Sequence, residues 1–377
     1  MSEPTEILNA TLRRANANLD QSFIPDQQIR ESAAYVARNL KNRAGVRLLM
    51  ACLLAKLHRA DVDLRKPYTE IGDADTFSGR TYDERYITAF INEHNLPCNS
   101  TTAFLTPALR NRNITLTKKV NLIGKPPQLY QAVLGLLDDV HSDRVTADAL
   151  LAEIVRFLLI DRNERQHRIE GLVATLHTTK DAVPLSSEDI VNLIEKHLSL
   201  KGTSRLSVLV VAAAYQSAEE FLGERVLPLQ AHNAADAQTG ALGDVEITLI
   251  GDDEVIIIYE MKNKRVARED IDRALQKLRF SSRQINNYIF ITTEPVDEEV
   301  QAYAKSLYHQ TGGIEFVILD CMGFIRHFLH LFHRLRTRFL EAYQALMLSE
   351  PQSAVSQAIK EAFLAMRQAA ETAMEEE

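Results

Sequence analysis

The chain has 377 residues, of which 46% are hydrophobic, and it carries a formal net charge of −8 at pH 7. That length favours two domains over one, and no apolar run approaches the roughly 18 residues that a membrane span needs. The start is acidic and polar, unlike a secretory signal, and the three distant cysteines form neither a zinc spacing nor a disulfide framework. We therefore expect a reduced, cytoplasmic protein. The negative charge argues against a general nucleic-acid coat protein but allows a local basic cleft.

Residues 1–200 are predicted to form a mostly helical first domain. Apolar side chains recur at helical spacing and predict helices over 27–42, 44–59, 129–140, 147–159, 169–176 and 187–198. A further helix is predicted to begin at Thr81, as an N-cap with Glu84 as its capping-box partner, and to end near Asn95. The mixed charges of residues 161–168 indicate a solvated helix face.

A polar tract over residues 96–113 contains several side chains of the kinds that contact DNA. Asn, Thr and Arg bind phosphates and base edges. The same composition is equally typical of a polar connector with satisfied turns. The candidate DNA-contacting residues in this half of the chain are Arg80, Asn99, Thr101, Arg110, Arg112, Lys118 and Lys119.

The pattern changes at residues 201–205, which predicts a domain boundary followed by an α/β core over residues 201–320. The predicted elements are a helix over 206–222, a strand over 225–230, a hairpin over 240–264, a helix over 268–280, a strand over 288–292, a helix over 296–310 and a strand over 314–319. The first three strands suit a meander, and the later two suit helical crossovers. Residues 321–377 are predicted to be a helical C-terminal extension.

Two apolar, β-branched runs flank the turn residues of the predicted hairpin. If the turn centres on Asp252, then Asp244 and Glu260 face each other across the ladder. Directly opposed Cβ atoms lie about 5 Å apart, close enough for two carboxylates to share one divalent ion. Lys262 lies two residues after Glu260, so its side chain shares that face. The alternative is an ordinary solvated face.

Further acids are candidates beside this pair. On the helix over 206–222, Glu219 falls on the side of the apolar residues, and Glu220 replaces it if the helix is rotated. Glu246 shares the face of Asp244, with an ion pair to Lys264 as its alternative role.

With this element order in place, residues 205–320 resemble the PD-(D/E)xK nuclease superfamily. The motif consists of Asp244 followed by Glu260-Met261-Lys262, with Gly243 where the motif name has proline. Residues 78–85 and 232–247 are similar to restriction endonucleases of the SacI family. The resemblance implies an α/β fold with a restriction-endonuclease-like mixed β-sheet core flanked by helices, after a mostly helical N-terminal domain and before C-terminal helices.

The resemblance also implies a type II restriction endonuclease that cuts double-stranded DNA with Mg²⁺. Asp244, Glu260 and the Met261 carbonyl would hold the ion, and Lys262 would orient the attacking water. Glu219 would bind a second ion or a metal-bound water. Additional DNA contacts are expected from Asn233, Gln276 and Lys277. A homodimer and a companion DNA methyltransferase are expected with it.

Two other readings stay open. A DNA-recognition subunit that uses a nuclease-like fold only for binding is the first, and the complete set of Asp, Glu and Lys argues against it. A helical interaction protein with an incidental α/β domain is the second. It predicts no DNA retention at low salt.

Overall fold

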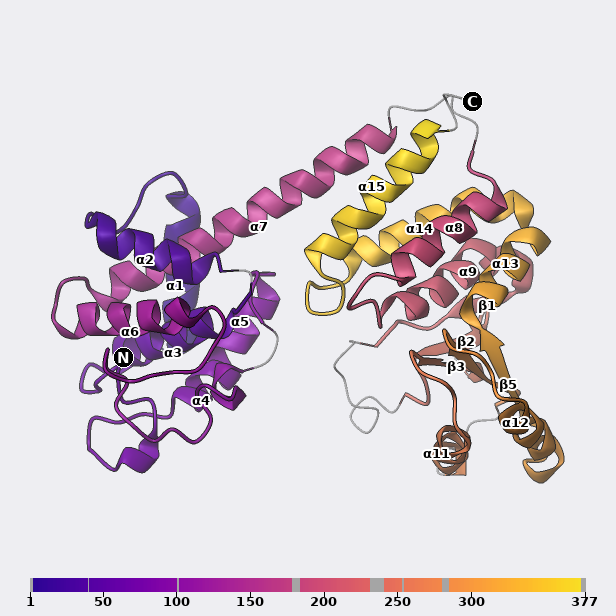
Figure 1. Ribbon diagram of the computed structural model, residues 1–377, viewed down its shortest axis with the longest axis horizontal. Coiled ribbons are helices and arrows are strands. Elements are labelled where there is room, and N and C mark those ends of the chain that lie inside the picture. The colour runs from indigo at the N-terminus through magenta and orange to yellow at the C-terminus, as the bar shows by residue number, and fades with distance from the viewer. Residues whose placement is uncertain are drawn as a thin grey trace. The chain divides into compact units, whose positions relative to one another are not determined.

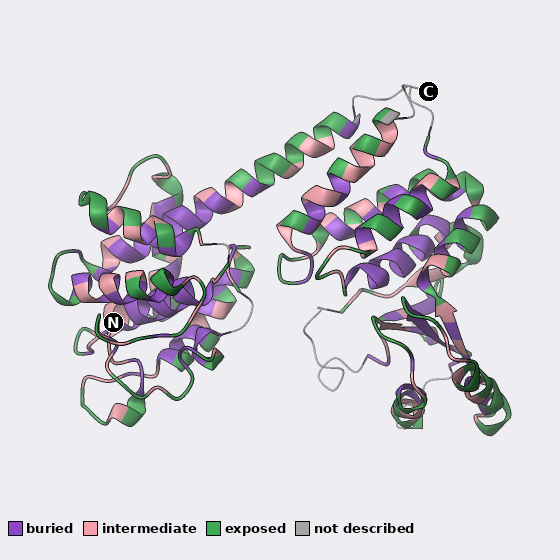
Figure 2. Ribbon diagram, viewed as in Figure 1, coloured by how far each residue is buried: buried purple, intermediate pink, exposed green. Residues whose placement is uncertain are grey.

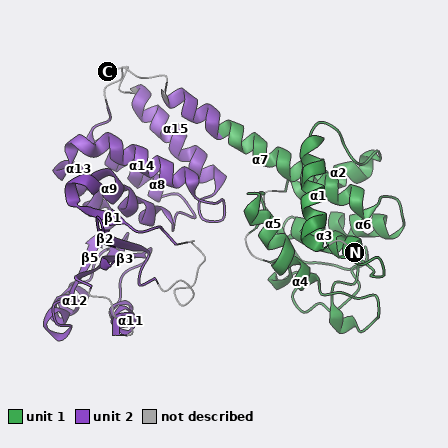
Figure 3. Cartoon of the chain, turned by 180° about the vertical axis from the view of Figure 1, so that it is seen from behind, with its two compact units in different colours: residues 1–168 green, residues 169–377 purple. Residues whose placement is uncertain are grey.

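The computed structural model describes residues 3–39, 41–99, 102–177, 184–230, 241–252, 254–279 and 285–373. The chain divides into two compact units, residues 1–168 and residues 169–377 (Figure 3). This division falls earlier along the chain than the boundary expected at residues 201–205. The reason is that the helix just before those residues, Ser187–Leu198, buries Ile190 and Ile194 in the core of the second unit.

Unit 1 is helical (Figure 1). Its elements are α1 (Pro4–Ala17), α2 (Gln27–Ala37), α3 (Ala44–His58), η1 (Thr69–Ile71), α4 (Gly79–Tyr82), η2 (Asp83–Ile87), α5 (Thr88–Glu93), η3 (Ala103–Leu105), α6 (Pro127–His141) and α7 (Ala147–His177), which continues across the division. Every residue of α3 from Ala44 to Ala55 is buried, so α3 is the central helix of this unit (Figure 2). Cys52 is one of its core residues.

Two local expectations for unit 1 were wrong. The helix that contains Tyr82 is capped by Ser78, whose side chain accepts the Thr81 N–H, so Thr81 lies inside the helix rather than at its cap. Residues 161–168 are not simply a solvated face, because Asp161 and Arg165 are buried. Asp161 forms ion pairs with Arg43 and Arg165, so the mixed charges of the sequence pair internally.

Unit 2 contains a five-stranded sheet in the order β1-β2-β3-β4-β5. The strands are β1 (Glu224–Val226), β2 (Val245–Leu249), β3 (Val255–Lys262), β4 (Asn287–Thr292) and β5 (Glu315–Asp320). β1, β2 and β3 are antiparallel, whereas β4 and β5 run parallel to β3. β1 is shorter than expected because Pro228, which lacks an N–H, cannot extend the ladder.

The helices of unit 2 cover both faces of this sheet. They are α8 (Ser187–Leu198), α9 (Leu206–Leu222), α11 (Arg268–Arg279), α12 (Glu298–Gln310), α13 (Cys321–Leu331), η4 (His333–Leu335), α14 (Arg336–Ser349) and α15 (Gln357–Ala373). One face, with Val245, Ile247 and Tyr259, packs against α9, α13 and α14. The other, with Ile258 and Phe290, packs against α11 and α12. Residues after 320 therefore complete the main core of unit 2 and are not an extension from it.

This arrangement confirms the expected fold class, a mixed sheet flanked by helices after a mostly helical N-terminal half. The hairpin register is also as expected, since Val245 pairs with Tyr259 and Glu246 with Ile258. The three cysteines are free thiols. Among the residues that the structure describes, no helix has the length and apolarity to cross a membrane.

Candidate active site

Asp244 and Glu260 lie at the same end of the hairpin. The Asp244 N–H donates to the Tyr259 carbonyl at 2.8 Å, beside Val245 and Tyr259, the last pair of the β2–β3 ladder. The Asp244 carboxylate then accepts the Met261 N–H at 2.7 Å. The side chain of the first acid is thereby held against the peptide that follows the second.

Glu260 is nearly buried and is held from several directions. The Lys262 ammonium donates to Glu260 Oε1 at 2.5 Å. The hydroxyl of Tyr288 donates to Glu260 Oε2, and the Lys277 ammonium of α11 lies 3.7 Å from the same oxygen. Three elements, β3, β4 and α11, therefore fix one carboxylate.

A second acid, Asp270, lies behind Lys262. It is 1% exposed, accepts the Ala267 N–H at 3.0 Å and begins α11. Lys262 lies 3.5 Å from it, and Arg273 pairs with it as well. Burial alone would raise the pKa of Asp270, but the Ala267 N–H and the surrounding cations together lower it. Asp270 is thus held as an anion that anchors Lys262.

Gly243, just before Asp244, is required by the packing. A Cβ at this position would meet the Ile258 side chain at 2.4 Å and the Tyr259 carbonyl oxygen at 2.7 Å. The backbone of the loop therefore lies directly on β3, which brings Asp244 to the strand end. Proline, the residue in the motif name, would clash here.

The oxygen atoms at this strand end suit a hard divalent cation. Among the described residues, no group of three or more His, Cys, Asp or Glu side chains is arranged around a metal position. Mg²⁺ does not require one, because it keeps several waters and is commonly held by one or two carboxylates. The Met261 N–H points to Asp244, and in a strand the carbonyl of a residue points to the same side as its N–H. Asp244, Glu260 and the Met261 carbonyl therefore fit this ion.

Glu219 is not brought to this site. It lies one turn beyond Tyr215 on α9, whose end at Gly223 adjoins Ile250 at the turn end of the hairpin. Leu249 is five residues, roughly 17 Å of strand, from Asp244. Glu220 pairs with Arg338 on α14 instead.

Glu246 has a local structural role. Its carboxylate accepts the Leu242 N–H at 2.7 Å and so holds the loop that leads into β2. The expected ion pair between Glu246 and Lys264 is replaced by a contact of Lys264 with Asp270, at 3.9 Å.

The expected DNA-contacting residues are distributed over both units. In unit 1, Arg80 pairs with Glu84, Lys118 pairs with Asp138, and Arg112 donates to the Ala108 carbonyl. Asn99, Arg110 and Lys119 are exposed. In unit 2, α11 presents an exposed Gln276 and brings Lys277 to Glu260. Thr101 and Asn233 lie outside the described residues.

Sequence reasoning missed Tyr288 and the anchoring role of Asp270. The role of Tyr288 depends on how the strands pair, which the sequence does not show. Strand β4 places Tyr288 beside Ile258 in parallel register. The period of two then sets its side chain on the face of Glu260. In the sequence, Asp270 is one of several acids in the first turn of a predicted helix, so nothing there distinguishes it.

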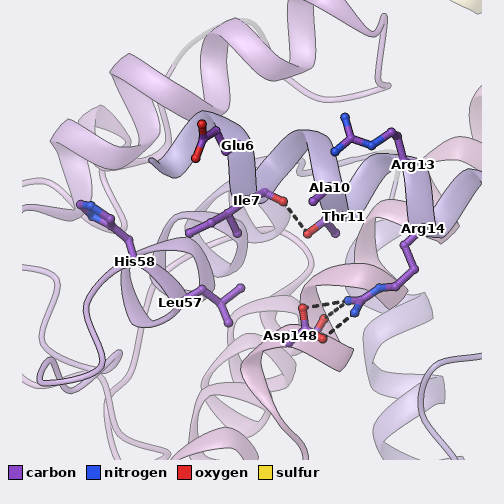
Figure 4. Close-up of a pocket in the computed structure, with 9 residues that line it drawn as sticks. All are labelled: Glu6, Ile7, Ala10, Thr11, Arg13, Arg14, Leu57, His58 and Asp148. Carbon is purple, nitrogen blue, oxygen red and sulfur yellow. Dashed lines mark hydrogen bonds and ion pairs between the residues drawn. The ribbon is translucent and has the colours of Figure 1, made fainter. Parts of the chain in front are cut away.

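Two cavities in the described parts of the chain lie away from this site. One, of about 550 Å³, lies in unit 1 against α1, where Arg14 is bound by both carboxylate oxygens of Asp148 (Figure 4). The other, of about 500 Å³, lies beside β1 and is lined by Arg205, which pairs with Glu350.

Comparison with known proteins finds one family similar to part of the chain. Residues 182–294 match the family described as the SacI restriction endonuclease C-terminal domain, which confirms the similarity expected for residues 232–247, whereas the tract over residues 78–85 lies outside the matched segment. The match covers less than half of the chain but includes every residue around Glu260 described above. No curated protein matches the chain. Residues 182–294, within the second unit, are therefore similar to the SacI restriction endonuclease C-terminal domain, a family of restriction-type nucleases.

Proposed function

We propose that the protein is a Mg²⁺-dependent, sequence-specific endonuclease of the type II restriction class that hydrolyses phosphodiester bonds in double-stranded DNA. The observation that carries the proposal is that Asp244 and Glu260 lie at one end of the hairpin, where the Asp244 carboxylate accepts the Met261 N–H and Lys262 pairs with Glu260. This arrangement is the one that the PD-(D/E)xK motif describes, and it lies inside the matched family segment.

Each residue has a separate task in this proposal. Asp244, Glu260 and the Met261 carbonyl would hold Mg²⁺, which when bound polarises the scissile phosphate and acidifies a water. Lys262 would orient the attacking water and offset the negative charge that develops on the phosphate. Asp270 would hold the Lys262 ammonium in place, because it is a buried anion 3.5 Å away.

The assembly follows from the number of sites. One such site cuts one strand, and cleavage of a duplex needs two. A homodimer is therefore proposed, with one site for each strand. A companion DNA methyltransferase is proposed as well, because a site-specific nuclease endangers the DNA of its own cell.

The test is a plasmid digest with and without Mg²⁺, followed by mapping of the ends. The wild-type chain is expected to cut at defined positions only with the ion. Asp244→Ala, Glu260→Ala and Lys262→Ala are each expected to lose at least about 100-fold in cleavage rate while DNA retention and thermal stability persist. Lys305→Ala, an exposed lysine on α12, is the matched control and keeps full activity.

Two results would contradict the proposal. Full cleavage by any of the three variants would remove those residues from the chemistry. Tight DNA binding by the wild-type chain without Mg²⁺-dependent cleavage would instead identify a DNA-binding subunit.

A further inference from the structure

One long stretch of unit 1 has an uneven charge distribution. The chain has 51 acidic and 43 basic residues, yet residues 94–137 contain no aspartate or glutamate. The same stretch contains five Lys and Arg residues, namely Arg110, Arg112, Lys118, Lys119 and Lys125. A local excess of positive charge in a negative protein calls for an explanation other than solubility.

Part of this stretch, residues 119–125, begins in the turn that the Val120 N–H closes on the Thr117 carbonyl, and packs against α6. The Gln131 side chain of α6 donates to the Val120 carbonyl at 3.2 Å. Leu122 is 3% exposed, and Gly124 lies so close to the Tyr130 ring that a Cβ would approach it to 2.4 Å. The inner side of the segment is therefore fixed to the helix.

The outer side carries every second residue. Lys119, Asn121, Ile123 and Lys125 are exposed, whereas the residues between them are buried or half-buried. This alternation of exposure places the four side chains on the outer side of the segment. We call these four residues the outward row.

The outward row has no internal partners for its charges. Lys118, just before it, pairs with Asp138 of α6, but Lys119 and Lys125 form no ion pair with any described carboxylate. Ile123 is 74% exposed, more than any other large apolar side chain in the described part of the chain. Exposing an isoleucine side chain to water is unfavourable, so its position between two unpaired lysines indicates a binding role.

The chemistry of the row fits duplex DNA better than a protein surface. Lysines bind phosphates and release counterions, asparagine pairs with adenine, and apolar side chains contact the thymine methyl group. Lysine is depleted at protein–protein interfaces, so two of them beside one apolar residue do not suit a protein partner.

We propose that the outward row binds duplex DNA, with Lys119 and Lys125 on phosphates and Asn121 and Ile123 on base edges. This inference rests on the proposed function and adds that sequence is read in unit 1, whereas the cutting residues belong to unit 2. The outward row contains one residue, Lys119, of the DNA contacts expected from the sequence.

The experiment selects bound duplexes from a random library in EDTA, so that cleavage plays no part. It uses the full-length wild-type chain, Lys119→Ala/Lys125→Ala, Asn121→Ala/Ile123→Ala and the control Arg13→Ala/Arg59→Ala. The control removes two positive charges elsewhere in unit 1, at the exposed Arg13 and at the half-buried Arg59, which pairs with Asp61. Thermal unfolding of each chain shows that the fold is kept, as expected for exposed residues.

The two test variants are expected to fail differently. Lys119→Ala/Lys125→Ala should weaken binding to every duplex and reduce the slope of log K against log salt by about 1 to 2. Asn121→Ala/Ile123→Ala should keep that slope, lose about 10-fold or more on the selected sequence and lose preference at one or two base pairs. The control should match the wild type in both respects.

The outcomes separate this inference from the proposed function. If the wild type selects and cuts a sequence, and both test variants match the control, the outward row does not read DNA although the nuclease proposal stands. If the wild type selects no sequence and cuts nothing with Mg²⁺, both proposals are wrong.

Discussion

Tyr288 shows how one buried hydroxyl positions a reactive acid. Its ring is fully buried and stacks on Phe316, so the side chain has no other rotamer available. Its hydroxyl lies within hydrogen-bonding distance of the Leu242 carbonyl and of Glu260. The carboxylate is thereby held on the side opposite to Lys262.

We expect Tyr288→Phe to weaken Mg²⁺ binding by about 10-fold or more, because residues that orient a metal ligand commonly have effects of that size. The fold should persist, since only the hydroxyl is removed. The measurement is the increase in unfolding temperature as Mg²⁺ is added, with the Mg²⁺ dependence of cleavage beside it. Tyr303→Phe, which loses a hydroxyl bound to Asp272 on the surface, is the control. Equal Mg²⁺ titrations for the two variants would contradict the positioning role.

Gly243 offers a second test at the scale of one residue. We expect Gly243→Ala to lower the free energy of unfolding by about 1–3 kcal/mol, because the added methyl group meets Ile258 and the Tyr259 carbonyl. Chemical denaturation measures this change. The matched variant Gly171→Ala, in open space on α7, should instead be neutral or stabilising by up to about 1 kcal/mol. An unchanged stability for Gly243→Ala would show that the loop does not press on β3.

At the scale of elements, three helices of unit 2 meet at one histidine. His197 of α8 is fully buried, with one ring nitrogen 2.9 Å from the Tyr343 hydroxyl of α14. The other lies 3.1 Å from the Ile359 carbonyl of α15. Burial lowers the pKa of His197 from 6.5 to about 4, so the ring is neutral at pH 7.

We therefore expect the stability of unit 2 to fall as the pH falls from about 6.5 to about 4. In that range the unfolded chain binds a proton at His197 and the folded chain does not, so acid favours unfolding by up to about 3 kcal/mol. The loss levels off below the folded pKa. Denaturation at several pH values measures it, and His197→Gln should reduce the slope in this window. His309→Gln, an exposed histidine on α12 with no ion pair to a described carboxylate, should leave the slope unchanged.

At the scale of the molecule, the two units are stabilised by separate cores. No hydrophobic cluster of the described residues includes side chains from both units. Unit 1 depends further on an ion pair between Arg47 of α3 and Asp83, in which both side chains are completely buried. Asp83 also accepts hydrogen bonds from the hydroxyl of Thr102 and the N–H of Ala103.

We expect calorimetry to show two unfolding transitions, since separate cores unfold separately. Asp83→Ala should lower the free energy of unfolding of unit 1 by about 3–5 kcal/mol, because Arg47 is left buried without a counter-charge. The transition of unit 2 should stay unchanged. Asp61→Ala, which breaks an exposed pair with Arg59, should shift neither transition noticeably. A single transition that Asp83→Ala lowers as a whole would show that the units unfold together.

The spacing of apolar and turn residues along the sequence predicted much of the fold and the alignment of three candidate site residues. The hairpin register follows from the period of two and from the turn residues, so Asp244, Glu260 and Lys262 could be aligned from the sequence. Helices α8 and α9 begin and end where the apolar period and their flanking residues predict. The resemblance to the SacI family could also be recognised from the sequence alone.

Only the tertiary structure decided what surrounds these residues. Lys277 and Tyr288 reach Glu260 because the α11 crossover sets β4 beside β3, and no local period encodes that pairing. Glu219 lies elsewhere because α9 runs toward the turn end of the hairpin. Asp161 is buried because Arg43, more than a hundred residues earlier, neutralises it. Contacts between distant segments depend on how whole elements pack, and side-chain periodicity describes only the element in which it occurs.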